Sequence, residues 1–339
     1  MQKTFILAIL AIFGLSFFAS TYAGQVEEAG MKWYDDMDEA KAAAEKSDKL
    51  IYIYFTGGQG CGWCVKMKGE TFSNSDVQSK VLSKYVIVML MVWDTQTSKA
   101  KTEDKQLLGS YGGRGVPFNV VLDKDLKLVK KFSGYKSATD FIKEMEPLPK
   151  AYKELAKLLK KVEKKSGQKY KNYYEIAKIY SETLIDKVKA GEFAQKALEK
   201  DEENKEGNHA ELNYMLLEKA AAENKSEEVK KFMAKVKELD EKNKEGYYEK
   251  VVQIEIATYL NNKDWTNAIK VYTEFADSEV DFHKDQKQTT KWFVAVAYIN
   301  NKDWGNAKKF LKEVIDLDKD NAIGKTAAKY LEQIEGQGF

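Results

Sequence analysis

The two cysteines of this chain, Cys61 and Cys64, have two residues between them in the segment FTGGQGCGWCVKM. Cysteines at this spacing can supply half of a zinc site, close a small structural disulfide or form a redox-active pair. A structural zinc ion needs four ligands, and the two histidines, His209 and His283, lie far along the chain in helix-compatible polar sequence. A disulfide that closes so short a loop constrains the unfolded chain little. The spacing therefore favours a redox pair and implies no metal ion and no cofactor.

A helix that begins at Cys61 would explain how such a pair reacts. The free N–H groups at a helix N-terminus and the helix dipole favour negative charge, which lowers the pKa of a thiol and supplies thiolate. Cys61 would then attack a partner disulfide or leave as a thiolate. Cys64 lies on the same helix face at i+3 and would resolve the mixed disulfide. We therefore expect an exposed, readily ionised sulfur at position 61, with the second sulfur within bonding reach.

The sequence around the pair predicts an α/β domain. Helical periodicity alternates with short apolar segments between residues 35 and 145, as in helices packed on one sheet. The predicted helices cover 35–49, a short stretch from Cys61, 73–84 and 137–145, and the predicted strands cover 50–55, 85–92, 118–123 and 126–132.

The chain changes character at the segment EPLPK, which contains Pro147 and Pro149. Proline disfavours helix at the residue before it, so we expect a domain boundary here, between a domain at 24–148 and a domain at 150–339. In the second domain Tyr, Leu, Ile, Val and Phe recur at helical spacing with Lys and Glu between them.

The second domain also repeats itself. YLNNKDWTNAIKVYTEF at 259–275 matches YINNKDWGNAKKFLKEV at 298–314, 39 residues later. Gly207, Gly246 and Gly324 follow similar acidic segments at one and then two such intervals. Each repeat would be a helix pair that buries its apolar face by stacking on its neighbours.

These repeats resemble tetratricopeptide (TPR) repeats, in which a tyrosine, a short turn, an Asp-Trp pair and an alanine follow one another. The matching residues are Tyr259, Asp264, Trp265 and Ala268, and then Tyr298, Asp303, Trp304 and Ala307. The period is longer than in the family, and no proline follows the second helix. Two repeats are clear, two or three more are expected before them, and the aromatic residues are expected in the core. The resemblance implies a surface that binds a protein or peptide.

Residues 1–23 have the layout of a secretory signal peptide. A positive charge at Lys3 precedes an apolar run at 5–18, and small residues, including Ala23, precede the expected cut. The run is too short to cross a bilayer as a helix. We expect a periplasmic or secreted mature chain with no membrane span, and an uncleaved membrane anchor is the alternative.

Charge and glycine patterns argue against nucleic-acid and nucleotide partners. The formal net charge is +2 and is spread through mixed Lys and Glu runs, which is typical of solvated helix faces. The segments TGGQG and YGGRG are not followed by Gly-Lys-Ser/Thr, so their glycines are expected to serve turns rather than a phosphate cradle.

The region 31–145 resembles the thioredoxin superfamily, and best its exported thioredoxin-like branch with a W-C-x-W-C-K motif. The matching segments are GCGWCVKMKGETFSNSDV and GVPFNVVLDKDLKLVKKFSGY. The resemblance implies a thioredoxin-like fold and thiol–disulfide exchange. It also implies a cis peptide bond between Val116 and Pro117, in a segment that faces the cysteines and offers backbone to the substrate chain. An X-Pro bond that opens a predicted strand agrees with this role.

The sequence departs from the family at three positions. Gly60 stands where tryptophan is usual before the first cysteine, and Phe118 stands where threonine is common after the proline. Where thioredoxin has a buried aspartate behind the cysteines, this strand offers Tyr54 or Phe55. These departures bear on the redox potential and on proton transfer. Glu70 could supply a nearby carboxylate, or it could be a solvated residue at the helix end.

Two exposed side chains are candidates for contact with a partner. Trp63, between the cysteines, could bind substrate or shield the pair from water. Arg114, on the loop that leads to Pro117, could pair with a carboxylate of a partner or be solvated.

Together these features predict an exported thiol–disulfide oxidoreductase whose partners are protein disulfides or dithiols and a redox partner protein, with helical repeats that bind a protein or peptide. The direction of electron flow depends on the surroundings of the pair, and the resemblance alone favours a reductase. The alternative is a scaffold protein in which the repeats dominate and the first domain holds partners without turnover.

Overall fold

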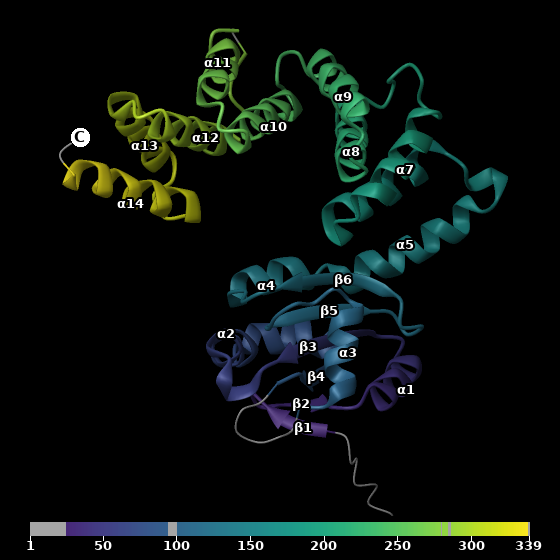
Figure 1. Ribbon diagram of the computed structural model, residues 1–339. Coiled ribbons are helices and arrows are strands. Elements are labelled where there is room, and N and C mark those ends of the chain that lie inside the picture. Colours follow the sequence, from purple (N-terminus) through teal and green to yellow (C-terminus); the bar gives the residue numbers. More distant parts are fainter. Residues whose placement is uncertain (1–24, 94–99, 279, 284–285, 338–339) are drawn as a thin grey trace, which may run out of the picture. The chain divides into compact units, whose positions relative to one another are not determined.

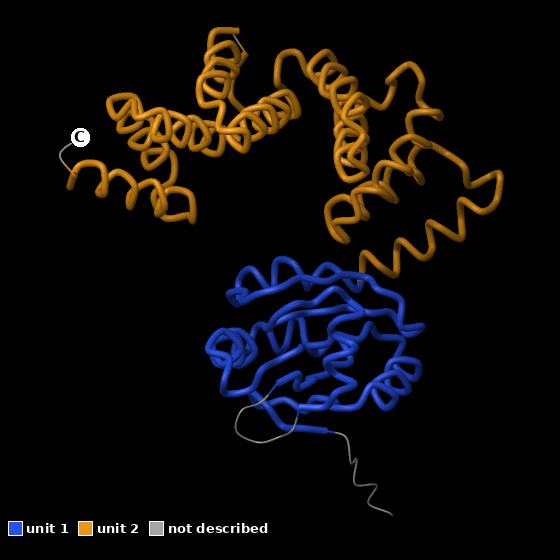
Figure 2. The backbone as a smooth tube through the Cα atoms, in the orientation of Figure 1, with its two compact units in different colours: residues 1–149 blue, residues 150–339 orange. Residues whose placement is uncertain are grey.

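The computed structural model describes residues 25–93, 100–278, 280–283 and 286–337. It consists of two compact units, Met1–Pro149 and Lys150–Phe339 (Figure 2). The expected signal peptide at 1–23 lies outside the described residues. Within the described ranges, no helix combines the length and the apolar character that a membrane span requires.

The first unit is built on a mixed sheet whose strands follow the order β1-β2-β4-β3-β5-β6 (Figure 1). The central strands β3 and β4 are parallel, whereas β5 runs antiparallel to β3. All seven residues of β3 are buried, because helices cover both faces of the sheet. The strands are β1 (Gln25–Glu28), β2 (Met31–Tyr34), β3 (Leu50–Thr56), β4 (Tyr85–Met91), β5 (Phe118–Leu122) and β6 (Leu128–Ser133).

The residues of β3 alternate between two cores. Ile51, Ile53 and Phe55 pack with residues of α1 and α3 on one face. Tyr52 and Tyr54 point to the other face, where they join an aromatic cluster with Trp33, Phe72 and Phe141. The helices of this unit are α1 (Met37–Ser47), α2 (Gly62–Lys66), α3 (Thr102–Ser110) and α4 (Ala138–Met145), with π-helical turns at Met67–Phe72 and Val77–Val81 and 3-10 turns at Gly58–Gly60 and Leu82–Lys84.

Three elements of this unit escaped the sequence analysis and one was misplaced. Strands β1 and β2 are only four residues long, and α3 buries few side chains. None of these three elements therefore gives a clear hydrophobic periodicity in the sequence. The last strand was expected from Leu126, but Leu126 has a left-handed backbone with φ 60° and belongs to the turn. The strand therefore begins at Leu128.

The second unit is helical (Figure 1). Its first helix begins at Leu148, two residues before the unit itself begins, with Pro149 in the first turn, where the missing N–H of proline costs no hydrogen bond. The helices are α5 (Leu148–Val162), α6 (Tyr170–Lys178), α7 (Lys187–Leu198), α8 (His209–Ala222), α9 (Ser226–Leu239), α10 (Tyr247–Asn261), α11 (Trp265–Ala276), α12 (Lys287–Asn300), α13 (Trp304–Leu317) and α14 (Ala322–Gly336), with a π-helical turn at Ile179–Leu184 and a 3-10 turn at Lys165–Gly167.

A backbone conformation recurs through this unit every 39 residues. Ile185, Asn224, Lys263 and Lys302 are all left-handed, with φ of 58°, 58°, 59° and 61°, and each ends the turn inside one helix pair. Four pairs can therefore be traced among the described residues, α6–α7, α8–α9, α10–α11 and α12–α13, two of them before the pairs that the sequence repeats make clear. The helical-repeat class is confirmed.

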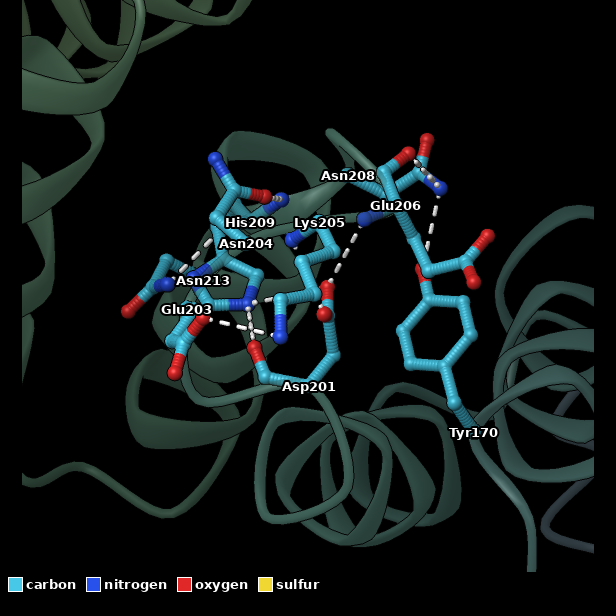
Figure 3. A network of polar contacts seen from close by, with 9 residues as sticks. All are labelled: Tyr170, Asp201, Glu203, Asn204, Lys205, Glu206, Asn208, His209 and Asn213. Carbon is cyan, nitrogen blue, oxygen red and sulfur yellow. Dashed lines mark hydrogen bonds and ion pairs between the residues drawn. The ribbon is translucent and has the colours of Figure 1, made fainter.

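The connections between pairs also repeat. Asp201 accepts hydrogen bonds from the backbone N–H groups of Lys205 and Glu206, and His209 lies against the carbonyl of Asp201 (Figure 3). Asp240, 39 residues later, likewise accepts hydrogen bonds from backbone N–H groups that follow it, those of Glu245, Tyr247 and Tyr248. Gly207 and Gly246 have φ of 76° and 77° in these connections, whereas Gly324 lies inside α14. The acidic segments therefore fix turns.

Candidate functional site

Cys61 and Cys64 form a disulfide at the start of α2, with their Cα atoms 5.2 Å apart. Strand β3 leads through the 3-10 turn at Gly58–Gly60 to Cys61, which is the N-cap residue of the helix. The expected helix at the cysteines is therefore present. Cys61 keeps 9% of its surface exposed and Cys64 none. The expectation of an exposed sulfur at position 61 is therefore wrong for this oxidised form, in which both cysteines are buried and Cys61 is the less buried of the two.

The backbone of the helix start supports charge on the first sulfur. The N–H of Cys64 donates to Sγ of Cys61 at 3.2 Å. If this donor keeps its place in the reduced pair, it would favour the thiolate of Cys61. That Cys61 reacts and Cys64 resolves the mixed disulfide stays a prediction.

The Val116–Pro117 peptide bond is cis and lies beside the disulfide. The carbonyl oxygen of Val116 is 3.7 Å from Sγ of Cys61. A disulfide sulfur carries no proton, so in the oxidised form the two atoms are only in contact. In the dithiol form, the thiol of Cys61 can donate a hydrogen bond to this carbonyl. Strand β5 begins at the next residue, Phe118, which anchors the segment to the sheet.

Trp63 is 60% exposed and belongs to a surface cluster next to the disulfide. Its ring lies 5.8 Å from that of Tyr135, and the ammonium group of Lys66 stands over both rings at 5.4 and 4.9 Å. The hydroxyl of Tyr135 donates to Glu70 at 2.7 Å, and this bond, with burial second, raises the pKa of Tyr135. Glu70 thus bonds to Tyr135 and Lys66 rather than to the cysteines.

Behind the disulfide the structure distinguishes between Tyr54 and Phe55. The hydroxyl of Tyr54 donates to the carbonyl of Cys64 at 3.1 Å. Phe55 points to the opposite face of the sheet and packs with α1 and α3. Sequence alone could not choose between them, because adjacent strand residues face opposite sides and nothing marks the side of the cysteines.

Arg114 and the two histidines lie apart from these contacts. Arg114 is exposed on the segment between α3 and β5, and its role in partner binding stays a prediction. His209 bonds within a repeat connection (Figure 3), and the backbone N–H of His283 donates to Glu249. Within the described ranges, no cluster of three or more His, Cys, Asp or Glu residues could hold a metal ion.

Comparison with known proteins gives one family and several solved structures. Residues 36–148 match the family model of a thioredoxin-like domain. No curated protein matches the chain. A DsbH oxidoreductase is 19% identical, with 35% of this chain and 83% of that chain covered and a TM-score of 0.32. The oxidised C-terminal domain of DsbD from Neisseria meningitidis is 22% identical, with 31% and 86% covered and a TM-score of 0.26. YrrB, a TPR protein with an unusual peptide-binding site, is 18% identical, with 56% and 89% covered and a TM-score of 0.37.

Proposed function

Because the chain contains a thioredoxin-like domain at 36–148, we propose that it is a thiol–disulfide oxidoreductase that exchanges disulfides with protein partners through Cys61 and Cys64. The observation that carries this proposal is the asymmetry of the pair. Cys61 keeps 9% of its surface exposed whereas Cys64 keeps none, and the sulfur of Cys61 accepts a hydrogen bond from the N–H of Cys64 at 3.2 Å.

In the reducing direction, the thiolate of Cys61 attacks one sulfur of a partner disulfide. A Cys61–partner disulfide forms, and the second partner sulfur leaves as a thiolate that takes a proton from water. Cys64 then loses its proton to solvent and attacks Sγ of Cys61. The intramolecular disulfide forms, the first partner sulfur leaves, and two electrons have moved to the partner. The same steps in reverse oxidise a partner dithiol.

The partner chain would lie along the segment that ends at Pro117. The backbone of Val116 is beside the reactive sulfur, so a polypeptide that pairs with it would bring its own sulfur close to Cys61. Trp63, two residues after the first cysteine, offers an exposed aromatic surface. We assign Trp63, Val116 and Pro117 to partner binding on this basis, and we add Arg114 because it is exposed two residues before Val116.

We assign the second unit to binding a protein or peptide, since stacked helix pairs present long surfaces to polypeptides. The predicted signal peptide at 1–23 assigns the mature chain to the periplasm or to secretion. There the partners would be substrate proteins and a redox partner protein that restores the pair.

The test uses the full mature chain with insulin as the disulfide substrate and dithiothreitol as the reductant. The wild type should accelerate insulin reduction, Cys61→Ser should be inactive, and Cys64→Ser should accumulate a mixed disulfide that mass spectrometry locates at Cys61. Full exchange activity in Cys61→Ser would overturn the proposal.

The scaffold alternative has its own readout. The size of the repeat unit, which extends from Lys150 to the end of the chain, is the observation that favours it. If a variant with both cysteines replaced by serine captures partner proteins as well as the wild type, and the wild type shows no exchange, the protein is a scaffold.

A further inference from the structure

Tyr54 ties the second cysteine to the centre of the sheet. It stands on β3, the strand that leads into the redox pair, and its side chain is fully buried. Its ring meets Phe72 edge-on at 4.8 Å and lies 6.3 Å from Trp33. From this apolar cluster its hydroxyl reaches the carbonyl of Cys64 at 3.1 Å. Both groups are closed to solvent, so water cannot replace the bond when it is lost.

The helix that receives this bond is irregular. Helix α2 is only five residues long and passes into a π-helical turn at Met67–Phe72. The carbonyl of Cys64, near the junction, also accepts the N–H of Met67, and so lies in the part of the helix where the regular ladder changes. A bond from β3 at this point fixes the height of Cys64 above the sheet.

Cys64 also carries the N–H that donates to Sγ of Cys61. A displacement of Cys64 would therefore move a donor away from the reactive sulfur. It would also move the resolving sulfur relative to the one that it attacks. One residue thus connects the hydroxyl of Tyr54 to both chemical roles of the pair.

Tyr54 acts here as a neutral donor. Burial raises its pKa above the ordinary value for tyrosine, the hydroxyl of Thr56 opposes this, and the charge of Glu28 adds to it. Glu28 of β1 is itself paired with Lys68 of the π-helical turn at 3.1 Å. The hydroxyl therefore keeps its proton over the pH range in which thiols ionise, and it cannot accept a proton as a buried carboxylate could.

We propose that Tyr54 is a positioning residue of the redox site, whose hydroxyl holds Cys64 so that its N–H stays directed at the sulfur of Cys61 in the dithiol form. This inference rests on the proposed function. It gives the position behind the cysteines a structural role in place of proton transfer.

The matched control is Tyr52, two residues earlier on the same strand and the same face. Tyr52 is also fully buried, and its hydroxyl donates to Asn119 at 2.6 Å, away from the cysteines. Tyr54→Phe and Tyr52→Phe each delete one buried hydroxyl from the same aromatic cluster. A loss of stability alone would affect both variants, whereas an effect on the redox pair would distinguish them.

The primary measurement is the pH at which the rate of alkylation of Cys61 by iodoacetamide reaches half of its maximum. It uses the reduced full-length protein, and mass spectrometry identifies the modified residue. Tyr54→Phe should raise this pH by about half a unit to one unit, since a weakened hydrogen bond to a thiolate disfavours the ionised form by that order. Tyr52→Phe should leave it unchanged. Insulin reduction at pH 7 should fall several-fold in Tyr54→Phe only.

A wild-type alkylation pH in Tyr54→Phe, or an equal rise in Tyr52→Phe, would overturn the inference. A wild type that alkylates as expected but exchanges no disulfides would overturn only the proposed function. Should Tyr54→Phe not fold, the wild type itself provides a test by NMR. Its Tyr54 hydroxyl proton should exchange slowly and show a contact to the backbone of residues 64–65 in both redox states, and its absence in the dithiol form would reject the inference.

Discussion

The indole ring of Trp93 lies so close to the backbone of Gly57 that a β-carbon on Gly57 would be 2.2 Å from Nε1 of the ring. Gly57 begins the loop that leads to Cys61, and Trp93 follows β4, the parallel neighbour of β3. The backbone of Gly57 has φ −103°, which any residue adopts. Close approach of the ring, rather than turn geometry, is therefore what requires glycine at this position.

Gly57→Ala should push Trp93 away from this loop. We expect a loss of about 1–3 kcal/mol in unfolding free energy, typical of overpacking, and a change in tryptophan fluorescence. Gly69→Ala is the control, because a β-carbon there meets nothing within 4 Å. Adding Trp93→Ala to Gly57→Ala should recover part of the loss. Equal stability of the two single glycine variants would contradict the predicted contact.

Trp63→Ala should weaken exchange with protein substrates while leaving the reaction with a small disulfide unchanged. Trp63 is 60% exposed, so its loss should hardly change the thermal midpoint. An aromatic contact at an interface commonly contributes about 1–2 kcal/mol, which corresponds to a roughly 5- to 30-fold loss in kcat/KM for insulin. Oxidised glutathione serves as the small substrate. An equal loss with both substrates would place Trp63 in the chemistry instead of in partner binding.

The local sequence predicted the centre of the site but not its surroundings. The positions of Cys61 at a helix start and of Val116–Pro117 before a strand follow from short segments of sequence. The contact of Trp93 with Gly57 and that of Tyr135 with Trp63 join segments far apart in the chain. Such contacts depend on strand order and register, which the local pattern does not carry.

In the helical repeats, too, the local sequence pattern did not show every turn. Lys263 and Lys302 lie in two matching sequence segments, and each ends the turn inside its helix pair. In the two earlier pairs the residues at the end of this turn are Ile185 and Asn224. Isoleucine is β-branched and rarely adopts the left-handed conformation, so position 185 gives no turn signal. The backbone period persists where the residue pattern has been lost, so the sequence predicted further repeats before the two clear ones and the structure locates them.

We expect the free energy of unfolding to depend on pH through Asp104. Burial raises its pKa from 3.8 to about 6, with Lys101 opposing the shift and Glu103 adding to it. A carboxyl whose pKa is higher in the folded state contributes stability that is fully present below about pH 4 and is lost as the pH rises through about 6. Asp104→Asn, which mimics the protonated form, should therefore gain in thermal midpoint relative to the wild type as the pH rises from 4 to 7.

The exposed Asp76, replaced by Asn, serves as the control for this prediction. Its difference from the wild type should vary little over the same range. A constant difference between Asp104→Asn and the wild type from pH 4 to pH 7 would show that Asp104 ionises normally in the folded protein.

Glu249 is a buried acceptor that holds the connection between α11 and α12. Its carboxylate accepts hydrogen bonds from the backbone N–H of His283 at 2.8 Å, the amide of Asn243 at 3.2 Å and the hydroxyl of Thr290. Glu249→Ala would leave the N–H of His283 without its acceptor, whereas Asn243 and Thr290 keep the carbonyls of Asp281 and Gln286. We expect a loss of about 1–3 kcal/mol, measured by urea unfolding of the full chain. Glu245→Gln, at an exposed position nearby, should change stability by less than about 0.5 kcal/mol.

Position 225 offers a stabilising substitution. In three of the four traced helix pairs, the residue after the left-handed turn is aspartate, and Asp186, Asp264 and Asp303 each accept the N–H three residues on at 3.0–3.2 Å. Lys225 occupies the same position and makes no such side-chain bond to the start of α9. Asparagine would supply the missing acceptor without adding negative charge beside Glu227 and Glu228.

Lys225→Asn should raise the thermal midpoint, because an N-cap bond outweighs exposed ion pairs such as the one between Lys225 and Glu223. Lys225→Ala separates the two terms, since it removes the ion pairs and adds no cap. Asp264→Ala, which deletes an existing cap, should lose about 1 kcal/mol. The gain should appear as slower amide hydrogen exchange in the first turn of α9, since repeat units are stabilised locally and through their nearest neighbours. If Lys225→Asn is no more stable than Lys225→Ala, the turns of the four pairs are not equivalent in energy despite their common backbone.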